Sequence, residues 1–193
     1  MSTLLSDLQA LLGVEHVLTA ATDLAPFLTD NRGRWHGRAL CAVLPSTTEE
    51  VSAVMRVAAR HSALVFVQGG NTGNAAAATP VVSEEDASRS VLLLTKRMRR
   101  IEKVDQVNDT IVVQSGVPVA AVREAAAQAN RLFALSLASD GTAAVGGVLA
   151  TNAGGVHVLR YGSARDLCLG LEVVLADGRV LNLMRGLRKD NTG

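Results

Sequence analysis

The chain has 193 residues, of which 48% are hydrophobic and 19% charged, and its formal net charge is +1. This length allows one sizeable domain or two small lobes around a hydrophobic core. The composition excludes wholesale disorder and collagen-like sequence. The small net charge gives no reason to expect nucleic acid as a partner.

The two cysteines, Cys41 and Cys168, lie far apart in apolar runs, without Cys-x-x-Cys spacing or nearby histidines. We therefore expect buried free thiols and no metal site. Residues 1–12 include Asp7 and lack the uninterrupted apolar core of a signal peptide. No apolar run reaches the roughly 20 residues that a membrane span needs. These features lead us to expect a soluble, cytoplasmic protein.

Leucines at three- and four-residue spacing predict an amphipathic helix within Met1–Leu12, ended by Gly13. A polar, glycine-containing stretch occupies Asp30–Gly37. The short apolar run Ala39–Leu44 stops at Pro45, as a strand would.

A second helix is expected directly after Pro45. Two overlapping pairs with capping-box spacing mark its start, Ser46 with Glu49 and Thr47 with Glu50. The residues expected on its buried face are Val51, Val54, Met55 and Ala58.

The apolar run Leu64–Val67 predicts a buried strand that leads directly into a glycine-rich loop. After a run of alanines, Val81–Arg89 is expected to be a surface loop and Ser90–Leu94 a strand.

In the second half, Ile101–Asp105 and Thr110–Gln114 alternate as paired strands would, joined through Asn108-Asp109. A helix is predicted over Val119–Ala129, and Leu132–Leu137 is again strand-like.

A second hairpin is expected near the end of the chain, where Leu171–Leu175 and Arg179–Leu183 flank Asp177-Gly178. Strands, helices and hairpins in this mixture favour an α+β fold of two lobes over a purely parallel doubly wound sheet. We expect an N-terminal lead-in at 1–37, a first lobe at 38–95 and a second lobe at 96–193.

Two glycine-rich segments carry most of the functional information. The first is Gln68–Gly73; the second runs over Gly141–Gly147 and continues in Thr151–Gly155. Glycines let backbone amides approach an anion and allow positive φ, so two such loops suit a long ligand with two phosphates. Neither segment has the lysine of a Walker A loop or the Gly-x-Gly-x-x-Gly spacing of a Rossmann fingerprint.

Acid–base candidates are few. The four histidines are scattered, and His157 alone lies close to a glycine-rich segment. No Ser/His/Asp constellation or metal-ligand spacing stands out, so we assign no catalytic residue and no metal ligand. This is the pattern of a domain in which a bound cofactor supplies the reactive atoms.

The chain resembles the FAD-binding domain of the vanillyl-alcohol-oxidase type. Within that family it is most similar to the branch of glycolate oxidase subunits, D-lactate dehydrogenases and D-2-hydroxyglutarate dehydrogenases. The resemblance is continuous from about Leu18 to the last residue. The matching motifs are Val67–Gly73 with Thr79-Pro80, Leu135–Ser139 leading into Gly146-Gly147, Thr151–Gly155, Tyr161-Gly162, Gly170–Gly178 and Leu187–Gly193.

The resemblance implies a two-lobed fold with FAD lying between the lobes. By position, the first loop would wrap the diphosphate, the second segment would line the diphosphate, ribityl and flavin-ring region, and the backbone of Val173 would meet the adenine. No histidine stands in the first loop, where some relatives attach the flavin, which implies non-covalent FAD. The implied cofactor-binding residues are Gln68, Gly69, Gly70, Asn71, Thr72, Gly73, Asn74, Thr79, Ser139, Gly141, Thr142, Gly146, Gly147, Thr151, Asn152, Gly154, Gly155 and Val173.

The chain departs from the family pattern in three places. Alanines replace the usual glycines after Asn74, which costs about 1 kcal/mol wherever the backbone needs positive φ, and Val148 replaces a frequent asparagine. Family members also continue beyond Gly193 into a cap domain that carries the substrate-binding histidines.

We therefore expect the FAD-binding portion of an enzyme that oxidises a small D-2-hydroxy acid. The chain would be inactive alone, with a partner chain as one way to complete the active site. The alternatives are a truncated or degenerate remnant that serves as a structural or binding module, and a nicotinamide-binding Rossmann protein, which the hairpins disfavour.

Overall fold

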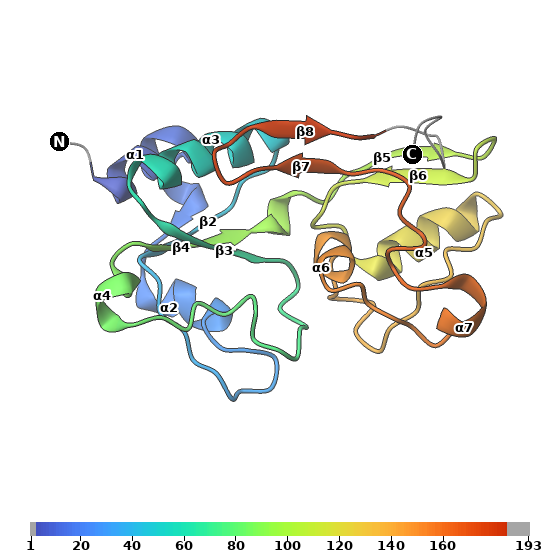
Figure 1. The fold of residues 1–193 in the computed structure, drawn as a ribbon, viewed down its shortest axis with the longest axis horizontal. Coiled ribbons are helices and arrows are strands. Elements are labelled where there is room, and N and C mark those ends of the chain that lie inside the picture. The colour runs from blue at the N-terminus through green and yellow to red at the C-terminus, as the bar shows by residue number, and fades with distance from the viewer. Residues whose placement is uncertain (1–2, 185–193) are drawn as a thin grey trace. The chain divides into compact units, whose positions relative to one another are not determined.

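The computed structural model describes residues 3–184, which form two compact units. The first unit comprises the chain up to Met98 together with residues 174–180, and the second comprises residues 99–173 and those after 180. Figure 1 shows the elements of both. The motif at Leu187–Gly193 lies outside the described residues. The expected lobe boundaries, at 37/38 and 95/96, stay a prediction.

The first unit is built on a four-stranded sheet in the order β1-β2-β4-β3. Strands β2, β4 and β3 run parallel, and β1 is antiparallel to β2. Val91 of the inner strand β4 is paired with Cys41 of β2 on one side and Val65 of β3 on the other. The strands are β1 (Val17–Leu18), β2 (Cys41–Val43), β3 (Leu64–Gln68) and β4 (Ser90–Leu94).

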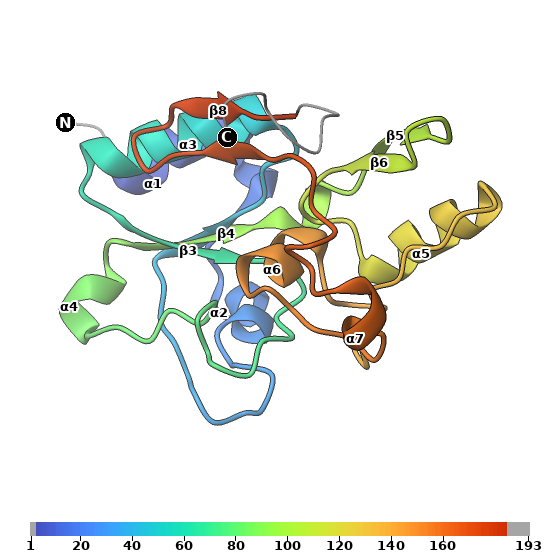
Figure 2. The same cartoon turned by 45° about the vertical axis from the view of Figure 1, so that its right-hand side comes forward.

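Helices cover both faces of this sheet, as Figures 1 and 2 show. Alternate residues of a strand point to opposite faces, so Val91 and Leu93 pack under α1 (Leu4–Leu12) and α3 (Thr48–Arg60). Leu92 and Leu94 pack on the other face, with residues of α2 (Ala21–Leu24) and the 3-10 turn η2 (Ala25–Phe27). Every residue of β4 is buried for this reason.

Two expectations for the first unit need correction. Thr47 caps α3 by accepting from the Glu50 amide, but the Glu50 carboxylate accepts from the Ser46 amide at 2.7 Å, so neither expected capping box is complete. The expected loop 81–89 contains a helical turn, α4 (Glu84–Ala87), because Ser83 accepts from the Asp86 amide as an N-cap does. The unit also holds 3-10 turns η1 (Val14–His16) and η3 (Thr95–Arg97).

The expected hairpin around Asp177-Gly178 is confirmed as β7 (Glu172–Val174) and β8 (Val180–Asn182). Gly178 has φ +84°, which favours glycine. Its carbonyl accepts a hydrogen bond from the buried Ser52 hydroxyl of α3. The turn of the hairpin is thereby held on α3.

Within its described residues, the second unit holds a hairpin and three short helices. The expected hairpin is confirmed as β5 (Ile101–Asp105) and β6 (Thr110–Val113), with Asp109 at φ +53° in its turn. The predicted helix is confirmed as α5 (Val119–Gln128), and α6 (Val145–Ala150) and α7 (Val158–Tyr161) follow. Its core comprises Val119, Leu135, Ala143, Val148 and Ala164.

The strand expected over Leu132–Leu137 is wrong. Leu135 is buried, but the backbone of this segment bonds to loops instead of a neighbouring strand. The Ser136 carbonyl accepts from the Val156 amide, and the Leu137 amide donates to the Asp140 carboxylate. The apolar pattern agrees with the burial of Ala134 and Leu135, but Leu132 is exposed, and the pattern could not show that the segment lacks a β partner.

The thiol expectations hold in part, because Cys41 is buried and Cys168 is half-buried, and both are free. Among the described helices, none is long and apolar enough to cross a membrane.

Candidate functional site

The loop after β3 offers a run of unengaged backbone amides. Among the described residues, none accepts a hydrogen bond from the amides of residues 69–78, and the next amide that does donate is that of Thr79. Successive backbone amides in an αR–αL or turn conformation can form a concavity that binds anions. The observed backbone therefore fits the phosphate-binding role expected of Gly69, Gly70, Thr72 and Gly73.

Side chains at every third position of this loop are bonded to the segment 27–32. Gln68 Nε2 donates to the carbonyls of Phe27 and Ala78, at 3.0 and 3.1 Å, so one buried side chain ties both ends of the loop. Asn71 Nδ2 donates to the Thr29 carbonyl at 2.7 Å. Asn74 Oδ1 accepts from Arg32 Nε at 2.9 Å. These side chains face the protein, and the intervening amides stay free.

Two buried polar atoms flank the same loop. Gln68 Oε1 precedes it and Thr79 Oγ1 follows it, and neither has a hydrogen-bond partner among the described residues. Buried polar atoms without partners cost about 1–3 kcal/mol each. A bound ligand or an ordered water near the loop would satisfy these atoms.

The expectation that glycines supply positive φ is wrong for both loops. In the first loop the left-handed conformation is taken by Asn71, at φ +53°, and by Ala76, at φ +54°. In the second segment it is taken by Asn152, at φ +49°. Asparagine tolerates this conformation, but the methyl group of Ala76 makes it costly by about 1–2 kcal/mol. The replacement of glycine by alanine noted in the sequence is therefore strained at Ala76.

In the second segment the amides without an acceptor among the described residues are those of Ala144 and of several glycines. Most of its other amides donate within the unit, for example Val145 to Val117 and Ala143 to Ser139. No described residue accepts from the amides at four glycine positions of the segment. These positions are Gly141, Gly147, Gly154 and Gly155.

The glycines of the second segment divide into packing and open positions. A Cβ on Gly146 would lie 2.9 Å from the Ser115 Cβ, and one on Gly155 would overlap the Ser136 carbonyl. A Cβ on Gly141 or Gly147 would meet nothing within 4 Å. Open glycines expose backbone that a ligand can approach, whereas the packing glycines allow the segment to close on its own unit.

The polar side chains expected at the cofactor are engaged within the second unit. Thr151 Oγ1 donates to the Gly147 carbonyl at 2.9 Å, and Thr142 Oγ1 donates to that of Ser139. Asn152 Oδ1 accepts from the Ser163 hydroxyl at 2.7 Å and from the Arg165 amide. Val173 lies in β7 and is 37% exposed. The hydrogen bonds of Asn152 and the two threonines therefore hold the loop in its conformation within the second unit.

Other chemistry is sparse in residues 3–184. There is no group of three or more His, Cys, Asp or Glu side chains suited to a metal. The ring of His157 lies 3.3 Å from the Ala134 carbonyl and packs edge-on to Tyr161, which explains this histidine structurally.

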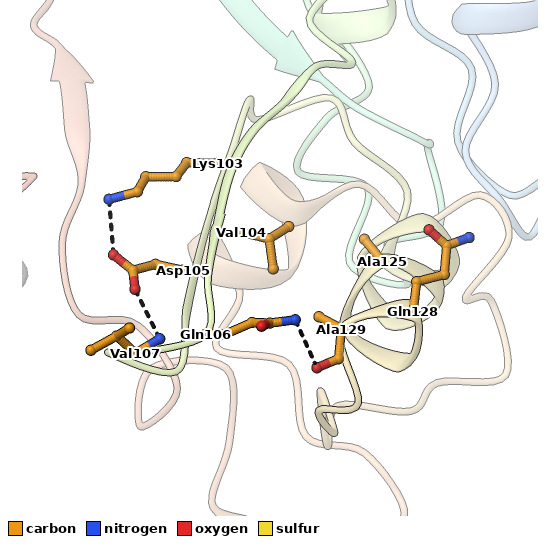
Figure 3. Close-up of a pocket in the computed structure, with 8 residues that line it drawn as sticks. All are labelled: Lys103, Val104, Asp105, Gln106, Val107, Ala125, Gln128 and Ala129. Atoms are coloured by element: carbon orange, nitrogen blue, oxygen red, sulfur yellow. Dashed lines mark hydrogen bonds and ion pairs between the residues drawn. The ribbon is translucent and has the colours of Figure 1, made fainter.

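A shallow depression of about 590 Å³ lies beside the β5–β6 hairpin (Figure 3). It is closed on one side by Gln106, which donates to the Ala129 carbonyl. A second depression of about 500 Å³ is lined by Arg100, Ile101 and Glu102. None of the residues expected at the cofactor lines either depression, so neither bears on the site.

Comparison with known proteins decides between the families considered above. Residues 39–184 match the FAD binding domain family. The chain belongs to this family. FAD is accordingly its cofactor, as the resemblance implied, and the nicotinamide alternative is excluded. Which individual residues contact FAD stays a prediction.

The curated relatives of this FAD-binding domain are longer proteins. The chain is 39% identical over 177 residues to "D-2-hydroxyglutarate dehydrogenase, mitochondrial" of Bos taurus, covering 92% of this chain and 31% of that protein. It is 36% identical over 174 residues to a D-2-hydroxyglutarate–pyruvate transhydrogenase of Saccharomyces cerevisiae, covering 90% and 34%. The chain thus spans about a third of the length of the curated relatives it matches.

Solved structures show the same fold. Alkyldihydroxyacetonephosphate synthase matches with a TM-score of 0.84 at 20% identity, over 97% of this chain and 36% of that one. p-Cresol methylhydroxylase matches with a TM-score of 0.71 at 24% identity, over 98% and 36%. The FAD-binding domain therefore has the vanillyl-alcohol-oxidase-type fold, as expected.

Sequence reasoning missed the contribution of the segment 27–32. Phe27 and Thr29 act through backbone carbonyls, which leave no trace in a sequence. Arg32 lies in the polar stretch 30–37. Its arginines beside a glycine were the sequence signal that could have indicated a role at the loop.

Proposed function

We propose that this chain is the FAD-binding portion of a flavin-dependent dehydrogenase that oxidises a small D-2-hydroxy acid. The observation that carries the proposal is the run of free amides at residues 69–78, which suits a diphosphate. Relatives named D-2-hydroxyglutarate dehydrogenase or D-lactate dehydrogenase support the substrate class.

Bound FAD would supply the hydride acceptor, and the chain's own residues would hold it in place. The amides of the first loop bind the phosphate oxygens, while Gln68 and Asn71 fix the loop to the segment 27–29. In the second unit, considered by itself, the amides of Gly147 and Gly154 also have no acceptor among the described residues. No histidine lies within residues 68–80, so the flavin is held without a covalent bond.

The groups that recognise the substrate belong, in this proposal, to residues outside this 193-residue chain or to a partner chain. The relatives are about three times as long as the region matched, which leaves ample chain for that task in them. The expected cytoplasmic location draws no support from the relatives, several of which carry "mitochondrial" in their names.

A titration with FAD tests the cofactor role of the chain. We expect the fluorescence of FAD to be quenched as it binds, and the purified complex to keep the visible flavin spectrum. A folded chain that leaves micromolar FAD unquenched would favour the alternative of a non-catalytic remnant. The strained backbone at Ala76 is the observation that supports this alternative.

A chimaera tests the substrate class. This chain would replace the matching region of the Xanthomonas citri D-2-hydroxyglutarate dehydrogenase, to which it is 34% identical over 175 residues. We expect the chimaera to reduce its flavin with D-2-hydroxyglutarate and not with the L-enantiomer. A chimaera that folds and binds FAD but is not reduced would contradict the proposed reaction while leaving the cofactor role intact.

A further inference from the structure

The segment that carries Arg32 is rigidly organised around Asp30. The Asp30 carboxylate is buried and accepts from the amides of Arg34 and Trp35, both at 2.7 Å, and from that of Arg32 at 3.2 Å. Its carbonyl accepts from the Gly33 amide at 2.9 Å. These bonds, that of Trp35 first, lower the pKa of Asp30, so the carboxylate stays ionised at neutral pH. The backbone of Arg32 is thus fixed before any ligand arrives.

The Arg32 side chain reaches the first glycine loop from this rigid turn. Its Nε donates to Asn74 Oδ1 at 2.9 Å, across 42 positions of sequence. The side chain is exposed, and among the described residues no carboxylate pairs with it. The amide oxygen of Asn74 carries no net charge, so this hydrogen bond does not neutralise the guanidinium of Arg32. Its two terminal nitrogens have no described acceptor and remain able to donate.

Among the described residues, an arginine side chain without a salt-bridge partner therefore stands beside a run of free amides. Asn74 belongs to that run, and so the anchored guanidinium and the amides lie on the same loop. Arginine presents a planar fork of donors that matches phosphate oxygens in geometry and charge. Asn74 acts as a positioning residue, because it holds one edge of the guanidinium and leaves the other edge open.

We propose that Arg32 binds an oxygen of the FAD diphosphate and adds a charged contact to the amides of residues 69–78. The inference rests on FAD as the cofactor of this family. The same oxyanion chemistry could come from the carboxylate of a hydroxy-acid substrate, and the test separates the two sources.

The test compares Arg32→Gln with Arg60→Gln. Each removes one positive charge from the first unit, but Arg60 lies on α3 and pairs loosely with Asp7, at 3.7 Å. The affinity of the 193-residue chain for FAD, ADP and riboflavin would be measured by calorimetry or fluorescence. For Arg32→Gln we expect FAD and ADP to bind about tenfold more weakly, since a charge-assisted hydrogen bond is lost. Riboflavin binding and the affinities of Arg60→Gln should not change.

The salt dependence of ADP affinity and a variant of the positioning residue Asn74 provide a second test. The affinity of the unmodified chain for ADP should fall as salt is raised, and this dependence should be shallower in Arg32→Gln. Asn74→Ala should weaken ADP binding less than Arg32→Gln does, because the charge remains but is no longer held.

The possible failures can be told apart. Equal ADP affinity in Arg32→Gln and the unmodified chain would overturn the diphosphate contact. If Arg32→Gln in the chimaera weakened the binding of D-2-hydroxyglutarate alone, Arg32 would be assigned to the substrate carboxylate instead. Failure of the unmodified chain to bind FAD or ADP would overturn both the cofactor role and this inference. Equal thermal unfolding of the two arginine variants would exclude misfolding as the cause.

Discussion

Gly154 and Gly155 are neighbours in the second glycine segment, but their surroundings differ. A Cβ on Gly155 would overlap the Ser136 carbonyl, whereas one on Gly154 would lie 3.7 Å from a Val158 methyl, an ordinary contact. We expect Gly155→Ala to lower the free energy of unfolding by about 1–3 kcal/mol, as forced overpacking does. The matched variant Gly154→Ala should change it by less than about 0.5 kcal/mol. Urea unfolding of both variants checks this, and equal effects would contradict the packing role of Gly155.

These glycines show how much of the role of a single residue the sequence predicts. The glycine-rich pattern located both loops, but it attributed one role to all their glycines. The structure separates the packing glycines Gly146 and Gly155 from the open positions Gly141 and Gly147. That difference depends on Ser115 and Ser136, which lie 31 and 19 positions before these two glycines, and a local motif carries no information about them.

At the scale of elements, the hairpin turn at residues 174–180 depends on one buried hydroxyl of α3. Ser52 is 4% exposed and donates to the Gly178 carbonyl. Ser52→Ala leaves that carbonyl buried without its partner, which should cost about 1–3 kcal/mol. The change would be measured by thermal or urea unfolding.

Ser88→Ala is the matched control for the Ser52 variant. Ser88 also donates its hydroxyl to a backbone carbonyl, that of Glu85 at 2.8 Å, but on the surface. Water can replace an exposed bond, so this variant should cost less than about 0.5 kcal/mol. If both serine variants lost the same stability, the hairpin turn would not depend on its contact with α3.

Elements with a strong local signal were predicted well. Ser90–Leu94 is a strand because five consecutive apolar and small residues fit a sheet covered on both faces. The dipeptide Asp177-Gly178 is typical of a tight hairpin turn, and the hairpin is observed. Leu132–Leu137 was mispredicted because an apolar run indicates burial, and only a neighbouring strand turns a buried segment into part of a sheet. The helical turn at Glu84–Ala87 was missed because four residues are too few to show a period.

At the scale of the whole chain, the family and its cofactor could be predicted because the motifs are spread in order over most of the sequence. The architecture of the first loop could not be predicted. Gln68 reaches Phe27 and Arg32 reaches Asn74 across 41 and 42 positions, and two of the three linked groups in segment 27–32 are carbonyls. Any residue can supply a carbonyl, so the sequence leaves such partners unspecified.

The pH dependence of stability should have an acid limb that arises from carboxylates in both units. Backbone amides lower the pKa of Asp30 and Asp177 in the first unit and of Asp166 in the second. A folded-state pKa below the unfolded value of about 3.9 means stability that is complete at neutral pH. That stability is lost as pH falls from about 5 through the lowered folded values, so urea midpoints should decline over this range.

The alkaline limb should come from the core of the first unit. Burial raises the pKa of the Cys41 thiol to about 12, from 9.0 when unburied. The folded state therefore keeps the neutral thiol while the unfolded state ionises, so stability is complete below about pH 9 and is lost as pH rises toward 12. Between pH 8 and pH 10 the free energy of unfolding should fall by about 1.4 kcal/mol. This equals the effect of one pKa unit, because only the unfolded state loses the thiol proton over this interval. Cys41→Ala lacks the thiol, so its free energy of unfolding should decline by that much less over the same interval. An identical decline in both proteins would show that Cys41 is solvated or already ionised in the folded chain.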